Sequence, residues 1–585
     1  MAKRILWNAD WEFCEHPAGE EACRMPEDGF TPIDIPHDYM IYDTHALYRD
    51  SVGWYRKRFT IKRAPKAEEK ISLRFDGVYM DTAVYVNSTF VGEWKYGYST
   101  FEFDITPSLR EGVNEVSVRI DYRYLNSRWY SGAGIFRNVW WISRGSSFIT
   151  PDGIYITPVE DANGRWKVEV DTELELHRAG AYFLEQKIFE KGIPERVIAS
   201  DSKEIAVSKE GRADVKEEQT LLLEEAPRLW DLEEGNLYEL ETSLYFGEAL
   251  LEKEVQTFGF RTLQFDPEQG FLLNGRKVKL NGVCEHHDFG CLGAAFSKAA
   301  ARRKLLKLRQ MGVNAIRTSH NMPAPEFMEL TDEMGFLVLS EAFDMWEKAK
   351  TAYDYARFFN DWFEKDVESW VRRDRNRASL LMWSIGNEIQ DTLVPERGVQ
   401  ITRALRDRVR QFDPKRHAPV TIGSNFMKWE NPQECAKELD CVGYNYSEYL
   451  YEEHHREHPD WVIYGSETAS VLASRSIYHF PLSRAILTDE DEQCSALGNS
   501  ITGWGAKSYE GCICDDRDKP FSMGQFLWTG FDYIGESTPY ETKNSYFGQI
   551  DTAGFPKDSF YIFQAEWTDY KKAPWYMFSP TGILT

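Results

Sequence analysis

The stretch Ser379-Leu-Leu-Met-Trp-Ser-Ile-Gly-Asn-Glu388, which follows a helical segment at residues 358–375, decides the fold of this chain. An apolar run of this length after a helix is typical of a buried strand. The same order of helix and short apolar strand recurs at residues 301–316, 326–340 and 402–422. This repetition over about 300 residues indicates a parallel (β/α)8 barrel.

Two stretches before the barrel have a different period. Between about residues 50 and 145, apolar and polar side chains alternate, as in Val116, Val118 and Ile120, and glycine-containing turns separate the runs. A second alternating stretch covers about residues 150 to 262, with several short strands in about a hundred residues. We expect a β-sandwich from the first stretch and an immunoglobulin-like sandwich from the second.

Composition excludes several classes of protein. The 585 residues carry a formal net charge of −25, which would repel phosphate backbones and anionic lipid, so no nucleic acid partner is expected. Neither an apolar membrane span nor the apolar run of a signal peptide is present, so we expect no membrane association and a cytoplasmic protein.

Cofactor and metal signals are missing as well. The nine cysteines lack the paired spacing of a zinc site, so we expect reduced thiols and no metal site built from them. No glycine-rich phosphate loop precedes a helix, so no organic cofactor is expected.

Two glutamates stand at the ends of predicted barrel strands, where barrel enzymes place their chemistry. Glu388 ends the strand quoted above, and Glu467 follows Trp461-Val-Ile-Tyr464 and Gly465-Ser466. Hydrolysis of a glycoside needs such a pair, about 5–5.5 Å apart in retaining enzymes and farther apart in inverting ones. An isolated strand-end glutamate is more often a helix cap or a partner in an ion pair at the rim.

Polar and aromatic neighbours support the catalytic interpretation. In Ile316-Arg-Thr-Ser-His-Asn321, Arg317 could hold a nucleophile ionised and His320 could donate to a sugar hydroxyl. His286 and His287 could suggest a metal pair, but adjacent residues on a strand point to opposite sides. Aromatic residues after strands, Tyr446 and Trp528, can stack on sugar faces, although core packing is more common.

The chain resembles glycoside hydrolase family 2, the β-galactosidases, β-glucuronidases and β-mannosidases, from about residue 35 to 578. The segments that carry this resemblance are Trp129-Tyr-Ser-Gly-Ala-Gly-Ile-Phe-Arg-Asn-Val139, Leu280-Asn-Gly-Val-Cys-Glu-His-His287, Asn314-Ala-Ile-Arg-Thr-Ser-His320, Ser384-Ile-Gly-Asn-Glu388 and Gly465-Ser-Glu467. The resemblance implies a jelly-roll sugar-binding domain (1–146), an immunoglobulin-like domain (147–262) and a catalytic barrel (263–585). It also implies retention through a glycosyl-enzyme intermediate.

The resemblance further implies roles for single residues. Glu388 is similar to the family acid/base, Glu467 to the nucleophile, and Asn387 to the residue that binds the sugar 2-hydroxyl. Tyr446 is similar to the tyrosine that touches the nucleophile, and Arg317 to the arginine beneath it. The expected walls of the sugar pocket are His287, His320, Asp344 and Trp528. Arg128 falls where relatives send a first-domain loop toward the active site, and it could equally be a surface arginine.

The sugar is less clearly indicated. Residues 341–346 and 476–481 are more similar to β-galactosidases, so we expect an exo-acting enzyme on terminal β-D-galactosides. The β-glucuronidases carry an Asn-x-Lys pair for the substrate carboxylate, whereas here Lys543 and Asn544 occur in the reverse order. A β-D-glucuronidase or galacturonidase is therefore the alternative, since a lysine in either order can contact a carboxylate.

Other interpretations remain open at this stage. A non-catalytic carbohydrate-binding protein would keep the fold but lose a glutamate, and a transglycosylase would share every residue. Relatives are often dimers or tetramers, so a homo-oligomer is an option, and the sequence does not decide whether Mg²⁺ or Na⁺ binds. The last residues, Thr581-Gly-Ile-Leu-Thr585, stand where many relatives continue into further β-sandwiches, and we hypothesise a one-nucleotide frameshift, which the coding DNA can test.

Overall fold

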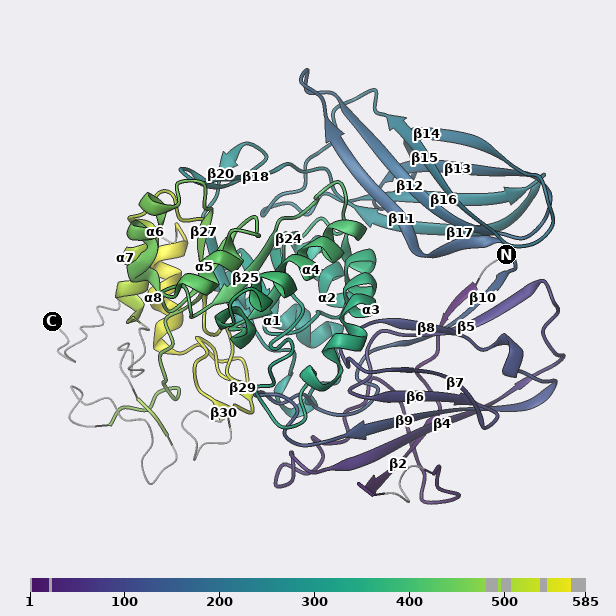
Figure 1. Ribbon diagram of the computed structural model, residues 1–585, viewed down its shortest axis with the longest axis horizontal. Coiled ribbons are helices and arrows are strands. Elements are labelled where there is room, and N and C mark those ends of the chain that lie inside the picture. The colour runs from purple at the N-terminus through teal and green to yellow at the C-terminus, as the bar shows by residue number, and fades with distance from the viewer. Residues whose placement is uncertain (1–2, 20–23, 480–492, 496–506, 537–543, 570–585) are drawn as a thin grey trace.

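The computed structural model describes residues 3–19, 24–479, 493–495, 507–536 and 544–569. Two β-sandwiches lie beside a helix-covered barrel (Figure 1). The predicted fold class is confirmed, since the eight parallel strands close into a barrel after two all-β units. No helix within the described ranges has both the length and the apolar character needed to cross a membrane.

The first sandwich packs a six-stranded sheet, in the order β3-β2-β4-β9-β6-β7, against a four-stranded sheet, β1-β10-β5-β8. The alternation predicts its core, because Val116, Val118 and Ile120 of β9 are all buried. The strands are β1 (Lys3–Leu6), β2 (Trp11–Pro17), β3 (Thr31–Ile33), β4 (Ser51–Ile61), β5 (Glu69–Phe75), β6 (Thr82–Val86), β7 (Thr89–Trp94), β8 (Phe101–Asp104), β9 (Gly112–Tyr122) and β10 (Val139–Gly145).

The second sandwich joins sheets β11-β12-β15 and β14-β13-β16-β17. Its strands are β11 (Phe148–Glu160), β12 (Trp166–Leu176), β13 (Gly180–Glu190), β14 (Ile193–Val207), β15 (Ala213–Leu222), β16 (Tyr238–Phe246) and β17 (Ala249–Phe258). On β12, Trp166, Val168 and Val170 point into the core, as their alternation with charged residues predicts. A small sheet of β18 (Leu263–Asp266), β19 (Gly270–Leu273) and β20 (Arg276–Lys277) leads into the barrel.

The barrel closes where β21 pairs with β28. Its strands are β21 (Leu280–Glu285), β22 (Ala315–Thr318), β23 (Leu337–Glu341), β24 (Leu380–Asn387), β25 (Val420–Ser424), β26 (Val442–Asn445), β27 (Ile463–Thr468) and β28 (Gly524–Leu527). Its helices are α1 (Lys298–Met311), α2 (Pro325–Met334), α3 (Ala356–Asp374), α4 (Arg397–Phe412), α5 (Glu430–Ala436), α6 (Tyr451–Glu457), α7 (Tyr509–Arg517) and α8 (Asp558–Trp567). Helix α1 begins after Ser297, whose side chain accepts from the Ala300 amide, and ends at Gly312 in the left-handed conformation.

Both sandwiches contact the barrel through buried polar groups. From the first, Arg137 donates to the carbonyl oxygens of Met322 and Pro323 in the loop between β22 and α2. From the second, the Tyr155 hydroxyl donates to Asp413, just after α4. These contacts fix both sandwiches on the barrel, and the first also sends Arg128 to the carboxyl ends of the barrel strands, which form the mouth of the barrel.

Candidate active site

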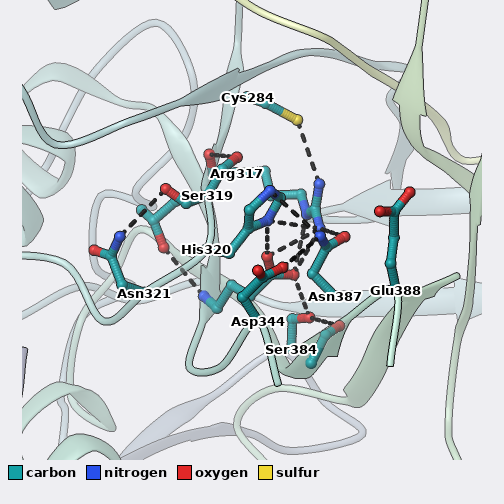
Figure 2. Close-up of polar contacts among 12 residues, drawn as sticks. Cys284, Arg317, Ser319, His320, Asn321, Asp344, Ser384, Asn387 and Glu388 are labelled. Atoms are coloured by element: carbon teal, nitrogen blue, oxygen red, sulfur yellow. Dashed lines mark hydrogen bonds and ion pairs between the residues drawn. The ribbon is translucent and has the colours of Figure 1, made fainter. Parts of the chain in front are cut away.

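Parallel barrel strands end at one face, so residues distant in sequence meet there. Asn387 ends β24 and Glu388 follows it, while Glu467 lies on β27 and Arg317 on β22. Figure 2 shows the side chains of Arg317, His320, Asp344 and Asn387 converging, with Glu388 beside them. The site therefore takes its groups from several strands that the sequence separates by up to 150 positions.

Glu467 is held from two sides. Arg317 Nη1 donates to Oε1 over 2.7 Å, and the Tyr446 hydroxyl donates to Oε2 over 2.7 Å. Burial raises the pKa of Glu467 to about 7 and nearby Glu388 adds to this effect, while Arg317 and Tyr446 oppose it. Each carboxylate oxygen thus has a donor that orients it and favours its ionised form.

Glu388 is held more loosely. Asn445 Nδ2 donates to its Oε1 over 3.2 Å, and Arg128 Nη1 lies 3.5 Å from Oε2. Its side chain is 14% exposed, against 5% for Glu467. The residue has a positive φ of 45°, so the chain turns sharply at the end of β24 and directs this carboxyl to the mouth.

A buried network lies under the nucleophile candidate. The guanidinium of Arg317 also donates to both oxygens of Glu341, and Ser384 donates to the same carboxylate over 2.7 Å. His320 Nδ1 lies 2.7 Å from Glu341 Oε1, and the His320 ring stacks on Trp528 with centroids 5.2 Å apart. Arg317 is therefore balanced between two carboxylates, Glu341 and Glu467.

Asn387 is fixed by a second network. Its Oδ1 accepts from Arg317 and Asn445, and its Nδ2 donates to Asp344 over 3.0 Å. Asp344 accepts from Arg128, through Nε and Nη2, and from Lys350 Nζ over 2.7 Å. Burial alone would raise the pKa of Asp344, but these two cations lower it to about 2. The carboxylate therefore stays charged.

Arg128 comes from the first sandwich and reaches the barrel. Besides Asp344, it approaches Glu536 to 3.6 Å. Its neighbour Trp129 forms a β-bridge with Gly535 in the loop after β29 (Tyr533–Ile534). The structure places this arginine in the mouth and not on an open surface.

The histidine pair needs a correction. His287, expected in the pocket wall, packs on Tyr98 of the first sandwich, and its Nε2 lies 3.1 Å from the Ser131 carbonyl oxygen. His286 faces Trp528 and His320 instead. Both rings follow β21, where alternate residues point to opposite sides, and the sequence did not reveal which side faces the mouth. Neither ring nitrogen of His286 has a hydrogen-bond partner among the described residues.

Four contributing residues were not among the sequence candidates: Glu341, Lys350, Asn445 and His286. Glu341 and Asn445 end strands β23 and β26, so the strand-end rule could have selected them. Lys350 donates to the Asn387 carbonyl oxygen from the loop before α3, and no local pattern marks it.

Some residues expected in the site lie next to, or outside, the ranges that the structure describes. Asn544 begins β30 (Asn544–Ser545) and pairs with Ile534 of β29, while Lys543 falls outside the described residues. The same holds for residues 480–481 and for the chain after residue 569. Within the described ranges, no three His, Cys, Asp or Glu side chains group as metal ligands would.

Comparison with known proteins identifies the family. Residues 30–145 match the sugar-binding domain of glycosyl hydrolases family 2, residues 148–261 match a further domain of that family, and residues 267–468 match its TIM barrel domain. β-Galactosidase BoGH2A of Bacteroides ovatus is 37% identical, over 97% of this chain and 72% of that protein. A β-glucuronidase of Bacteroides fragilis is 27% identical, over 96% of this chain and 81% of its own length.

A solved structure agrees with these sequence matches. A glycosyl hydrolase family 2 member from Bacteroides cellulosilyticus superposes with a TM-score of 0.83 at 29% identity, covering 97% of this chain and 71% of that one. Family, fold and strand-end carboxylates thus agree, and the chain belongs to glycosyl hydrolase family 2, as a glycosidase that acts on carbohydrate.

Proposed function

We propose that this chain is a retaining, exo-acting β-glycosidase that hydrolyses terminal β-D-galactosides. The observation that carries the proposal is the contrast between two carboxylates at one mouth. Glu467 is clamped by Arg317 and Tyr446, whereas Glu388 has one amide donor and a longer contact with Arg128. A clamped carboxylate suits a nucleophile, and a looser carboxyl suits a group that gives and takes a proton.

In the first step, Glu467 attacks the anomeric carbon while Glu388 transfers its proton to the leaving oxygen. The bond between Glu467 and the sugar removes the negative charge that Arg317 faced. Glu341 still balances Arg317 at that stage, through contacts of 2.9 Å from Nη2. Arg317 therefore has a carboxylate partner both before the first step and in the glycosyl-enzyme intermediate. Its buried positive charge is compensated in both states.

In the second step, Glu388 takes a proton from water as the water oxygen attacks the anomeric carbon, and Glu467 leaves as a carboxylate. The Asn387 amide, anchored by Arg317 and Asp344, is the group that we assign to the sugar 2-hydroxyl. Arg128 of the first sandwich and Glu536 of the barrel approach to 3.6 Å beside Glu388, and such a contact next to the acid/base suits a closed pocket for a terminal sugar better than an open groove.

Charge at the mouth supports a neutral sugar. Two cations near Glu388 are Arg128 and Lys350, and both are paired with the Asp344 carboxylate. A uronide carboxylate would have to compete with this buried partner. The relation to the β-galactosidase of Bacteroides ovatus supports the same choice.

A β-glucuronidase is the second candidate. Asn544 pairs with Ile534, two residues before Glu536, so its loop borders the mouth, and a β-glucuronidase of Bacteroides fragilis is a relative. In that case Lys543 would meet the substrate carboxylate in a charge-assisted contact.

The test is an assay with matched nitrophenyl β-D-galactoside, β-D-glucuronide, β-D-galacturonide and β-D-mannoside. We expect galactoside turnover, with β-galactose as the first anomer seen by NMR, and labelling of Glu467 by a 2-deoxy-2-fluoro galactoside. Turnover of a uronide alone would overturn the sugar assignment, and release of the α-anomer would overturn retention. Absence of any turnover would favour a carbohydrate-binding protein.

A further inference from the structure

Two exposed tyrosines border the mouth on loops from different domains. Tyr124, in the first sandwich, is 41% exposed, and Tyr353, in the loop before α3, is 43% exposed. The Tyr353 amide donates to the Leu125 carbonyl oxygen over 2.7 Å, so the two loops are joined directly. Exposed aromatic side chains on loops that contact each other can form part of a binding site.

These loops also carry the cations of the mouth. Arg128 lies four positions after Tyr124, and Lys350 lies three positions before Tyr353. Both cations contact Oδ1 of the buried Asp344 over 2.7 Å. Because the loops meet each other and the same carboxylate, the tyrosines stand at the entrance and not on a remote face.

Contacts of Glu388 indicate which part of a substrate the tyrosines would meet. Arg128 Nη1 lies 3.5 Å from Glu388 Oε2. An acid/base residue faces the oxygen between the two halves of a glycoside, so the side chains on its solvent side surround the leaving half. This step rests on the proposed function of Glu388.

Both loops are held in place before any ligand arrives. The Tyr124 amide donates to Asp50 over 2.7 Å, and its ring lies 5.3 Å from that of Tyr48. Asp354 accepts from the amides of Lys350 and Thr351, each over 2.7 Å. A prearranged surface binds without the cost of ordering it first.

We propose that Tyr124 and Tyr353 form an aglycone subsite that binds a ring-shaped leaving group through its apolar face. The aromatic rings provide a flat surface for a sugar or aryl ring, and the pocket beyond Arg128 takes the terminal sugar. The first sandwich thereby contributes to the choice of substrate as well as to the stability of the protein.

The test compares benzyl and methyl β-D-galactosides, whose leaving alcohols have similar acidity and differ by one ring. For Tyr124→Ala, Tyr353→Ala and the double variant, we measure the benzyl-to-methyl ratio of kcat/KM. We expect this ratio to fall, by about tenfold in the double variant. Tyr124→Phe and Tyr353→Phe keep the rings and should keep the wild-type ratio.

Phe90→Ala is the matched control, because Phe90 is an exposed ring on β7 of the same sandwich. It should leave the ratio unchanged. Equal losses on both galactosides, or an unchanged ratio in the double variant, would overturn the subsite. If the wild type cleaves only uronides, the galactoside proposal fails, and the benzyl and methyl uronides then test the subsite by the same ratio.

Discussion

The floor and the rim of the barrel mouth hold their carboxylates in different ways. On the floor, both donors to Glu467, Arg317 and Tyr446, belong to the barrel itself. At the rim, Glu388 meets Asn445 of the barrel and Arg128 of the first sandwich. The alignment of the nucleophile candidate thus depends on one domain, whereas the surroundings of the proton donor candidate depend on how two domains assemble.

The largest difference between the floor and the rim should appear when each glutamate is replaced by glutamine and the kinetic losses of the two variants are compared. Glu467→Gln removes the proposed nucleophile, so we expect kcat to fall by roughly 10⁴-fold or more on every substrate. For Glu388→Gln, kcat/KM, which reports the first step, should fall by about 10²–10⁴-fold on methyl β-D-galactoside and much less on dinitrophenyl β-D-galactoside, because dinitrophenolate leaves without protonation. Steady-state kinetics on both substrates would detect this, and an identical dependence on the leaving group in both variants would argue against the assignment.

Removing the inter-domain arginine should have the next largest effect. Arg128→Met leaves the buried Asp344 without its bidentate partner and disturbs Asn387, so we expect kcat/KM to fall about 10²-fold. Arg372 of α3 makes a comparable pair, 2.8 Å long, with Glu173 of the second sandwich, away from the mouth.

Arg372→Met is therefore the matched control for the rim. A partly exposed pair contributes about 1 kcal/mol or less, so kcat/KM should stay within about twofold of the wild type. Thermal unfolding of both variants would show whether they remain folded. Equal losses of kcat/KM in the two variants would mean that Arg128 acts through domain packing alone.

The pH dependence should reveal the smallest difference. With a pKa of about 7, Glu467 is protonated and inactive at lower pH, so kcat/KM should fall as the pH drops through 7. Tyr446→Phe removes a donor that favours the charged form, so this acid limb should move to higher pH. An acid limb that stays in place or moves to lower pH in Tyr446→Phe would contradict this prediction.

Local sequence patterns predicted the fold and several residues of the site. Val116, Val118 and Ile120 alternate because a sandwich strand buries every second side chain, and the structure buries all three. Glu388 and Arg317 could be selected because strand ends of a parallel barrel converge whatever the loops do.

Other parts of the site have no local signature. His286 and His287 are equivalent in sequence, and only the packing of Tyr98 against His287 shows which of them faces away from the mouth. Lys350 lies in a polar loop like many others, and it matters because its amine reaches Asp344 and the Asn387 carbonyl oxygen.

The sequence by itself determined two sandwiches, a parallel barrel and the two glutamates at its mouth, because period and strand ends are properties of short segments. Only the tertiary structure decided that Arg128 joins the site, that Glu341 balances Arg317, and that Tyr124 meets the loop of Tyr353. Such contacts join residues between 24 and more than 200 positions apart. These contacts depend on how domains and loops pack against each other. The sequence of a single segment does not determine that packing.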